Sequence, residues 1–432
     1  MTGLEYIIFV LLATIIVAYC TICSFKCLIN LRTKEFKVQY FIYLLFYLFY
    51  ILPVLSQLLF PNYQFEVFRR ANDAMAAFSP NLKYLTFVSI FSFLIMRTAH
   101  NDSKQTETRF YVNIPITNIC TIIVIGCFII TLAISGVEVI FGGYGYAYFH
   151  REAVEFNEGF VGVGILAYLI VLGSYRYVSK FRIILLTLIV FAFFWIEGKR
   201  NIVAETLIMA ICILGASGNM KGKKMVKYLI GGGSFLLLLS FLYGVFLKQN
   251  VTSFVDYFNV DFSRQYTLVY QFYCEEIGRQ ISINKYDSVL FLFTFFIPRL
   301  FWFDKPYPFV NNLTYSLIGY DDVEFSNAGW ATTCSIFSDL FDSFSIWGIV
   351  FGLWMFIKLF KKANQEKRLH FKVMWIYFTV RILTVQFSSA IVQISIMTVL
   401  LYLLNMLYKK NTVVYNPLII EKRHNVSFKN KS

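Results

Sequence analysis

Residues 6–25, YIIFVLLATIIVAYCTICSF, form a run of twenty residues that contains no charged side chain. A transmembrane helix needs about 20 consecutive apolar residues to cross the hydrocarbon layer of a bilayer. The nearest positive charges follow the run, at Lys26 and Arg32, and no positive side chain precedes it. This order of charges is opposite to that of a cleaved signal peptide. The stretch therefore predicts a spanning helix.

Apolar runs of similar length recur along the whole chain. Hydrophobic residues make up 58% of the 432 residues, which is more than a soluble domain of this size needs. The run at 289–297, VLFLFTFFI, is too short to span and is expected to be re-entrant or buried. We predict an all-α polytopic membrane bundle with about eleven transmembrane helices, at 6–25, 39–59, 81–96, 115–136, 159–175, 183–197, 201–217, 228–247, 343–360, 373–388 and 391–408.

The net charge of +14 does not indicate a nucleic-acid-binding protein, because the cations are distributed as in a membrane protein. Six segments hold 25 of the 39 Lys and Arg residues and only five acidic residues, and eleven spans bring all six to one side. Cytoplasmic loops carry such an excess, so the N-terminus is expected outside and the C-terminus in the cytoplasm. The six segments are 26–37, 97–110, 176–182, 219–227, 361–372 and 409–432.

The spans divide the chain into three parts. Residues 1–247 contain eight predicted spans, 248–342 form a large external loop, and 343–432 contain three spans and a basic cytoplasmic tail. Loops of this length in a compact protein are usually functional or disordered, and this loop is too rich in aromatic residues for disorder. We expect it to form short amphipathic helices on the membrane face.

The eight cysteines give no clear indication of a metal site. Cys20, Cys23 and Cys27 share one face of a predicted helix, but no His or acidic residue joins them, so packing is the simpler interpretation. Cys274 and Cys334 both fall in the external loop and are candidates for a disulfide, although their spacing alone does not fix the geometry. We predict no bound metal.

The segment IPRLFWFDKP, residues 297–306, brings charged residues into an aromatic stretch of the external loop. In one interpretation its rings form an interfacial belt, and Arg299 and Lys305 reach lipid headgroups with their charged ends. In the other, these two cations hold a phosphate at the membrane surface. Asp304 lies between them.

A second stretch, WIEGKRNIVAE at 195–205, marks the external hairpin between the sixth and seventh spans. Lys199 and Arg200 follow Gly198 there, although the positive-inside rule disfavours cations in an external hairpin. They lie where a helix begins, and its dipole attracts anions. Glu197 is positioned to neutralise one of them. The alternatives are an anion site at the mouth of the bundle and a charged tip that faces water.

Two more arginines have an unusual context. Arg264, in NVDFSRQYTLVYQF at 259–272, lies near Asp261, with which it would form a surface ion pair of little energetic worth. Arg381 lies inside a predicted span, where a charge must face the bundle interior or a water-filled cavity. Acidic partners are scarce in the spans, which leaves room for an anionic ligand beside Arg381.

His150 and Arg151 follow the run GGYGYAY at 142–148. Glycines let a ligand approach the backbone, and tyrosines stack on sugar rings and form hydrogen bonds with them. This pattern favours a carbohydrate ligand.

These stretches together resemble the Wzy-type O-antigen polymerases, which are bacterial oligosaccharide repeat-unit polymerases. The likeness is carried by GKR at 198–200, DFSRQYTL at 261–268 and IPRLFWFDKP at 297–306, in this order around a large periplasmic loop. FSDLFDSFSIWGIVFGLWM at 337–355 resembles the acidic and aromatic run that leads into a glycine-bearing span of the family. The similarity covers about the C-terminal 60% of the chain.

The resemblance implies a GT-C-like membrane glycosyltransferase in the bacterial inner membrane. Such an enzyme transfers a glycan from undecaprenyl pyrophosphate to a lipid-linked repeat unit at the periplasmic face, without a cofactor. A polysaccharide chain-length regulator is a candidate protein partner. The alternatives are a lipid-linked oligosaccharide flippase and an O-antigen ligase.

Chemistry of this kind needs cations for pyrophosphate and a base for the acceptor sugar. The candidate bases, among which the sequence does not choose, are His150, Glu197, Asp261 and Asp304. The candidate pyrophosphate-binding residues are Arg151, Lys199, Arg200, Arg264, Arg299, Lys305 and Arg381.

Overall fold

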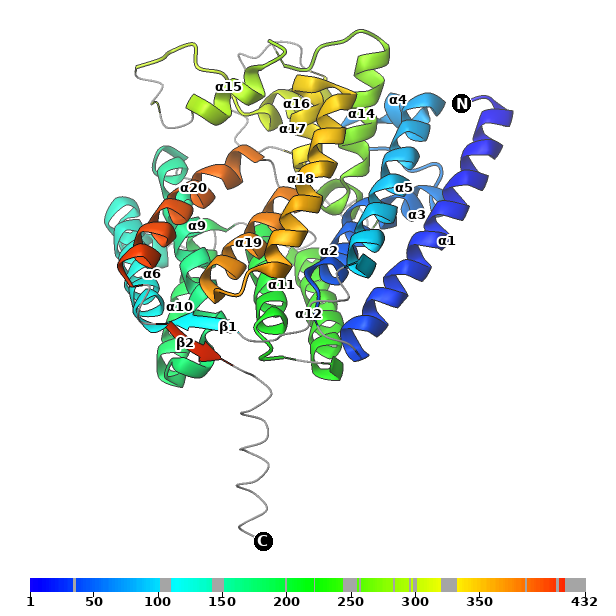
Figure 1. Cartoon of the computed structure of the whole chain (residues 1–432). Helices are drawn as coiled ribbons and strands as arrows, with labels where there is room; N and C mark the ends of the chain where they lie inside the picture. Colours follow the sequence, from blue (N-terminus) through cyan, green and yellow to red (C-terminus); the bar gives the residue numbers. More distant parts are fainter. Residues whose placement is uncertain are drawn as a thin grey trace.

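The computed structural model is all-α apart from two short strands (Figure 1). The structure describes residues 1–33, 36–101, 110–141, 151–198, 200–220, 222–243, 255, 258–282, 284–294, 297, 301–319, 332–384, 387–408 and 412–415. Within these ranges the description covers the backbone alone at 101, 110, 151–158, 200–201, 235–237, 239–243, 261, 292, 387–392 and 412–415.

Among the residues that the structure describes, four helical segments are long and apolar enough to cross a membrane. On the first of them, buried residues such as Ala13 and Val17 share one face, whereas Leu11 and Ile15 are 59% and 65% exposed. An exposed apolar face of this length is what a helix presents to lipid rather than to water. The four segments are α1 (Gly3–Thr33), the continuous stretch of α2 (Val38–Phe46), η1 (Tyr47–Ile51) and α3 (Leu52–Leu59), α5 (Phe78–Asn101), and α6 (Ile114–Ser135).

The remaining predicted spans all coincide with helices of the structure. Their boundaries shift by several residues. The helix predicted from 159 starts at Arg151, so it includes part of the segment between two predicted spans, 137–158. These helices are α9 (Arg151–Gly173), α10 (Lys180–Glu197), α11 (Arg200–Ala216), α12 (Gly222–Tyr243), α18 (Ile346–Gln365), α19 (Leu369–Thr384) and α20 (Phe387–Leu407).

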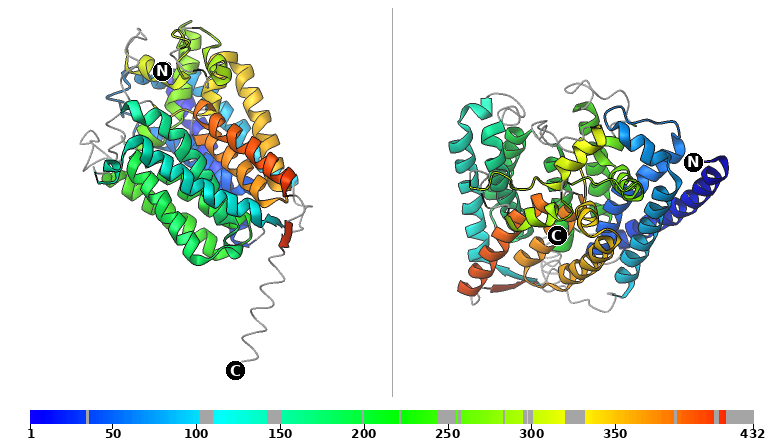
Figure 2. Two further views of the ribbon diagram at one scale, coloured as in Figure 1. Left: turned by 90° about the vertical axis from the view of Figure 1, so that its left-hand side faces the viewer. Right: turned by 90° about the horizontal axis from the view of Figure 1, so that it is seen from above.

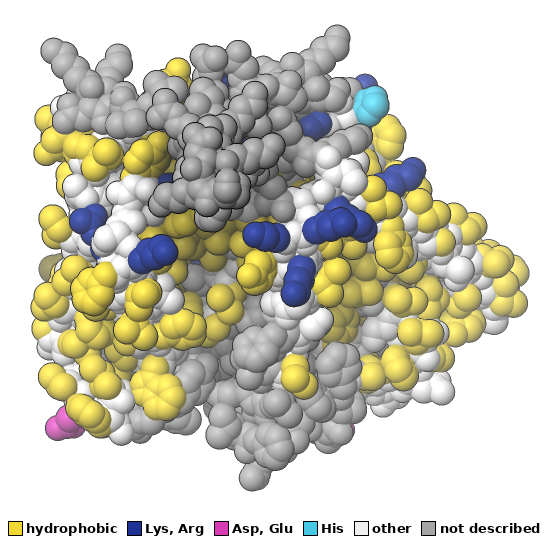
Figure 3. Space-filling view, turned by 90° about the horizontal axis from the view of Figure 1, so that it is seen from below, with side chains coloured by type: hydrophobic (Ala, Val, Ile, Leu, Met, Phe, Trp, Pro, Cys, Tyr) yellow, Lys and Arg dark blue, Asp and Glu magenta, His cyan; other side chains and the backbone are white. Residues whose placement is uncertain are grey.

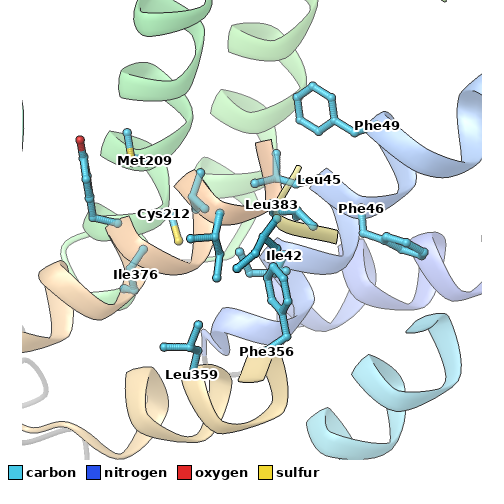
Figure 4. Close-up of a cluster of buried hydrophobic side chains, with 14 of the residues drawn as sticks. Ile42, Leu45, Phe46, Phe49, Met209, Cys212, Phe356, Leu359, Ile376 and Leu383 are labelled. Carbon is cyan, nitrogen blue, oxygen red and sulfur yellow. The ribbon is translucent and has the colours of Figure 1, made fainter. Parts of the chain in front are cut away.

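The long helices pack side by side around α11 and α19. Figures 1 and 2 show α1 and α5 on one flank of the bundle and α6, α9 and α10 on the other. Apolar side chains from α2, α11, α18 and α19 meet in its interior, where Ile42, Cys212, Phe356, Ile376 and Leu383 are buried (Figure 4). One apolar core therefore joins helices from the N-terminal and C-terminal parts of the chain.

Short helices form a layer at the end of the bundle that carries the N-terminus (Figure 1). The sequence predicted such helices in the external loop, but α14 and α16 do not lie on the surface. Eight consecutive residues of α14, from Gln265 to Phe272, are buried, because α14 packs against α4, α5 and α17. The layer consists of α4 (Arg69–Ala76), η5 (Phe258–Phe262), α14 (Gln265–Glu276), α15 (Asp287–Thr294), α16 (Phe309–Ile318) and α17 (Ile336–Phe344).

The apolar run predicted to be re-entrant or buried corresponds to α15. This helix has eight residues, so it is too short to span, as expected. Leu290 and Phe293 are 41% and 71% exposed, however, because α15 lies in the surface layer. One face of the run is therefore not buried within the protein, and its re-entry into the membrane stays a prediction.

A tight corner joins this layer to α18. Ser345 has φ 54°, a backbone conformation that is uncommon for any residue except glycine. Ser345 N donates to Phe341 O at 2.7 Å, and Gly348 N donates to Ser345 O at 2.9 Å. A side-chain carbon at Gly348 would lie 2.0 Å from Leu340 O, so only glycine fits where α18 turns away from α17.

The opposite end of the bundle carries β1 (Phe110–Asn113) and β2 (Thr412–Tyr415), which pair antiparallel. The short helices α7 (Glu138–Phe141) and η3 (Tyr175–Tyr177) complete the fold. Lys and Arg side chains gather on the face that carries the strands (Figure 3). The turn from α9 to α10, with Arg176, and the turn from α18 to α19, with Arg368, both lie at this end (Figure 1). Two of the basic segments of the sequence, 176–182 and 361–372, thus lie at the same end of the structure.

Candidate functional site

Arg264 lies between the surface layer and the helical bundle. Its side chain is only 3% exposed. Nη2 and Nε donate to Thr384 O at 2.6 and 3.2 Å, and Nη1 donates to Thr333 Oγ1 at 2.7 Å. Thr384 is the last residue of α19, where carbonyl groups have no partner within the helix. Arg264 is therefore a buried side chain that caps the end of α19. The expectation that Arg264 lies at the protein surface, in an ion pair with Asp261, is wrong because Arg264 is buried.

The backbone of Arg264 also joins the layer to the second span. Arg264 N donates to Phe49 O at 3.0 Å. Pro53, four residues after Phe49, has no N–H that would bond this carbonyl within the helix. The guanidinium lies 5.1 Å from the centre of the Phe49 ring. A proline in the sequence thus frees the acceptor to which Arg264 binds.

Arg381 lies one helical turn before Thr384 on the same helix. Its Nη1 pairs with Glu205 Oε2 of α11, and the two side chains are 11% and 6% exposed. Arg264 binds the carbonyl of Thr384, one turn beyond Arg381, so the two arginines and the carboxylate lie in one region of the bundle. The sequence analysis left room for an anionic ligand beside Arg381. In the structure, the carboxylate of Glu205 lies beside Arg381 and pairs with its Nη1. We call Glu205, Arg264, Arg381 and Thr384 the arginine cluster.

The polar face of α19 explains why these residues meet. Tyr377, Arg381 and Thr384 are separated by four and three residues, so they share one face of the helix. Tyr377 OH donates to Gln393 Oε1 of α20 at 2.7 Å. The apolar residues Ile376 and Leu383 lie in the buried cluster of Figure 4. Helix α19 therefore carries a polar stripe from the interior toward the layer.

The GKR hairpin lies at the layer end of the same region. Gly198 ends α10 with φ 62°, a left-handed conformation that glycine adopts without strain, and its N–H donates to Phe194 O at 3.0 Å. Helix α11 begins at Arg200, as the sequence predicted. At about 1.5 Å per residue, Arg200 starts about 7–8 Å above Glu205 along the helix axis. The first turn of α11 therefore approaches the arginine cluster. Glu197 is fully buried at the end of α10.

The segment 301–306 turns Lys305 inward. Lys305 is 7% exposed, and its Nζ donates to Ile297 O at 2.9 Å and lies 5.2 Å from the centre of the Phe291 ring. Phe301 and Phe303 are 79% and 91% exposed. The interpretation that Lys305 reaches lipid headgroups is therefore wrong, whereas the exposed rings fit an interfacial belt. Asp304 is exposed.

The structure adds a carboxyl that the sequence analysis did not single out. Asp342, in α17, accepts hydrogen bonds from Ser282 Oγ at 2.6 Å and Ser288 Oγ at 3.2 Å. Burial raises the pKa of Asp342 to about 6, and the hydrogen bonds from the two serines oppose this effect. A carboxyl with such a pKa exchanges protons near neutral pH. Its position in the acidic run at 337–355 was the only signal in the sequence.

Several predicted residues fall outside the description. His150, Lys199 and Arg299 lie outside the described residues, as do the side chains of Arg151, Arg200 and Asp261. Cys274 and Cys334 are both buried and free, so the candidate disulfide does not form. In the described ranges, no group of three His, Cys, Asp or Glu side chains is arranged to hold a metal ion.

Comparison with protein-family models, curated proteins and solved structures gives no match to this chain. The chemistry of the arginine cluster is therefore the guide to function. Arg381 pairs with Glu205, Arg264 caps α19 one turn further on, and the helix that carries Glu205 begins at Arg200. Such an arrangement suits a ligand with more than one negative charge near the layer.

Proposed function

We propose that the protein is a membrane glycosyltransferase that polymerises lipid-linked oligosaccharide repeat units. It transfers a growing glycan from undecaprenyl pyrophosphate to the non-reducing sugar of a new lipid-linked unit. The observation that carries the proposal is the convergence of Arg264, Arg381 and the first turn of α11 beside the surface layer. The order of the sequence stretches that resemble the Wzy-type polymerases supports the same activity.

The proposal includes a location and a topology. All eleven predicted spans cross the bacterial inner membrane in a GT-C-like arrangement, with the layer of α14–α17 in the periplasm. The basic end, with β1 and β2, faces the cytoplasm, in accordance with the positive-inside rule. The exposed rings of Phe301 and Phe303 support a layer that touches the periplasmic surface of the bilayer.

In the proposed reaction the bond between the anomeric carbon and the pyrophosphate oxygen breaks as the acceptor hydroxyl attacks. Negative charge develops on the leaving pyrophosphate, and fixed donors near it lower the barrier. Lys199 and Arg200, which the sequence places at the start of α11, and Arg299 are the proposed donors. Arg264 and Arg381 hold the helix ends that position them.

The acceptor hydroxyl must lose its proton to a base. His150, Glu197, Asp261 and Asp304 are the bases proposed from the sequence. Asp342 joins them because its pKa of about 6 matches a group that accepts a proton near neutral pH. Asp304 is exposed at the surface of its loop, whereas Asp342 is protected within the layer.

A flippase is the alternative from a different class. It would need a polar path for the oligosaccharide through the bundle. The space between α2, α11, α18 and α19 is filled by apolar side chains (Figure 4). The polar residues Arg381 and Thr384 of α19 lie in its last turn, where Arg264 binds. This arrangement favours chemistry at one surface over transport. A ligase remains the alternative within the same class of reaction.

Deletion of the gene distinguishes these functions. Loss of a polymerase leaves surface glycan with a single repeat unit, because flipping and ligation continue. Loss of a flippase leaves lipid-linked units on the cytoplasmic face, and loss of a ligase leaves polymerised glycan on the lipid carrier. Either of the last two results would contradict the proposal.

Single substitutions then test the residues. Arg200→Lys and Arg299→Lys should each give normal membrane abundance but a severely shortened glycan ladder, because lysine does not reproduce the two-pronged hydrogen bonding of arginine. Loss of one donor to a developing anion lowers the rate about 100- to 1000-fold. Arg182→Lys is the matched control, since Arg182 is partly buried at the start of α10, at the other end of the bundle, and donates a hydrogen bond to Asn118 Oδ1. Normal ladders from both variants would remove these arginines from the site.

A further inference from the structure

A groove opens at the basic end of the bundle, at the opposite end from the surface layer and the arginine cluster. Its volume is about 990 Å³. Three parts of the chain form it, namely the end of α18 with the turn to α19, the strand β1, and α20. Its lining residues are Tyr111, Lys358, Lys361, Lys362, Gln365, Glu366, Lys367, Arg368 and Asn405. Figure 3 shows this face of the molecule, where Lys and Arg side chains gather.

The groove is strongly positive. Five of its lining residues are Lys or Arg and one is acidic, so five positive charges and one negative charge leave +4. The acidic residue is already paired, because Arg368 Nε and Nη2 each donate to a carboxylate oxygen of Glu366 at 2.9 Å. Four lysines therefore line the groove without a carboxylate among the lining residues to balance them.

Backbone bonds and aromatic rings hold these cations in position. Tyr111 N donates to Lys367 O at 2.9 Å, which fixes the turn from α18 to α19 against β1. Lys362 Nζ lies 4.4 Å from the centre of the Trp375 ring, and the Arg368 guanidinium lies 4.4 Å from that of Phe371. A cation over a ring is stabilised by the ring electrons. The positive charge is therefore pre-organised rather than spread over a loose loop.

The groove lies at the level where a bilayer meets water. Lys358 Nζ is 5.6 Å from the centre of the Trp354 ring, and Trp354 is 53% exposed on the outer surface of α18. Tryptophan side chains concentrate at the depth of lipid headgroups. The positive-inside rule requires only that cations lie in the loops. Here the five cations of α18 and of the turn to α19 line one hollow that β1 and α20 complete. Basic pockets of this kind between helices bind lipid headgroup phosphates.

We propose that this groove binds a phosphate-bearing anion, supplied by the headgroup of an anionic phospholipid or by soluble phosphate. The site is separate from the arginine cluster and does not depend on the proposed polymerase activity. Its lysines bind the phosphate, and Arg368 with Glu366 keeps the turn in its shape. The position of Trp354 favours a lipid over a soluble ion.

The test compares two pairs of lysines in the full-length protein, purified in a neutral detergent. The variant Lys361→Gln/Lys367→Gln removes two exposed groove charges, and Lys223→Gln/Lys224→Gln removes two exposed charges from α12 at the same end. Thermal unfolding is followed with a thiol-reactive dye, because all eight cysteines are buried in the folded protein. Phosphatidylglycerol, phosphatidylcholine and inorganic phosphate are titrated in parallel.

Phosphatidylglycerol should raise the unfolding temperature of the wild type and of the α12 variant, and phosphatidylcholine should not. The groove variant should unfold at the wild-type temperature without lipid, but should need about 10- to 30-fold more phosphatidylglycerol for the same shift. If inorganic phosphate gives the same shift and the groove variant loses it, the site is confirmed and its ligand is soluble phosphate. Equal weakening in both variants, or no shift with any phosphate in the wild type, would overturn the site.

Discussion

Glu205 of α11 and Arg381 of α19 form an ion pair inside the helical bundle, one turn from the carbonyl of Thr384 that Arg264 holds. The pair links the helix that begins with the GKR hairpin to the helix that supports the surface layer. Both side chains are almost fully buried. Each charge therefore offsets the desolvation cost of the other.

Removal of one partner should destabilise the protein far more than removal of both. Glu205→Ala leaves a buried arginine without its carboxylate, and we expect the unfolding free energy to fall by about 3–5 kcal/mol. The double variant Glu205→Leu/Arg381→Met replaces the pair by apolar groups and should regain most of this loss. Thermal unfolding of the purified proteins measures both effects. A double variant that is less stable than either single variant would contradict the ion pair.

The corner between α17 and α18 should not accept any side chain at Gly348. Gly348→Ala brings a methyl group against Leu340 O, so the corner must open, at a cost of about 3 kcal/mol. Gly126→Ala in α6 is the control, because nothing lies within 4 Å of its added carbon. It should not lower stability, since alanine favours a helix. The measurement is the unfolding temperature of each variant, which should be lower for Gly348→Ala than for Gly126→Ala. Equal unfolding temperatures would show that the corner accommodates a methyl group without loss of stability.

Asp342 should make stability depend on pH. Its pKa is raised by burial, so the folded state binds the proton more tightly than the unfolded state does. The stabilisation is complete below about pH 4 and is lost as the pH rises through about 6. Asp342→Asn imitates the protonated form and should be more stable than the wild type at pH 7.5, by about 3 kcal/mol, with no difference near pH 4.

Thermal unfolding at pH 4, 5, 6 and 7.5 tests this prediction. Asp304→Asn, at an exposed site, should follow the wild type throughout. A loss of stability in Asp342→Asn at pH 7.5 would show that the charged form is the preferred one. If Asp342 is the base of the proposed reaction, the same variant gains stability while its glycan ladder shortens.

Opposite ends of the bundle should be accessible from opposite sides of the membrane. Lys285 lies in the surface layer and Gln365 at the basic end, and both are exposed. In spheroplasts, Lys285→Cys should react with an impermeant thiol reagent, and Gln365→Cys only after the membrane is permeabilised. The native cysteines are buried and give a low background. Labelling of Gln365→Cys in intact spheroplasts would reverse the orientation.

The helices themselves were predictable from the sequence. A run such as 6–25 becomes a helix in a membrane because its backbone has no water to bond, and this holds whatever its neighbours are. The GKR hairpin was also predictable, because its structure depends on local sequence. Gly198 has the left-handed conformation that ends α10, and α11 begins at Arg200. The regular alternation of predicted spans also predicted that the turns with Arg176 and Arg368 lie at the same end of the bundle.

The partners of the charged residues were not predictable, because they come from distant parts of the chain. Glu205 and Arg381 are 176 residues apart, and Lys305 binds a carbonyl of its own loop although it resembled an interfacial cation. Asp342 gave no signal beyond its acidic neighbours. The sequence thus determined which segments are helical and at which end the cations collect, since transfer of a segment into lipid depends on its own residues. Only the packing of α11, α14 and α19 decided which charges are buried and what neutralises them, because the energy of a buried charge depends on the groups around it.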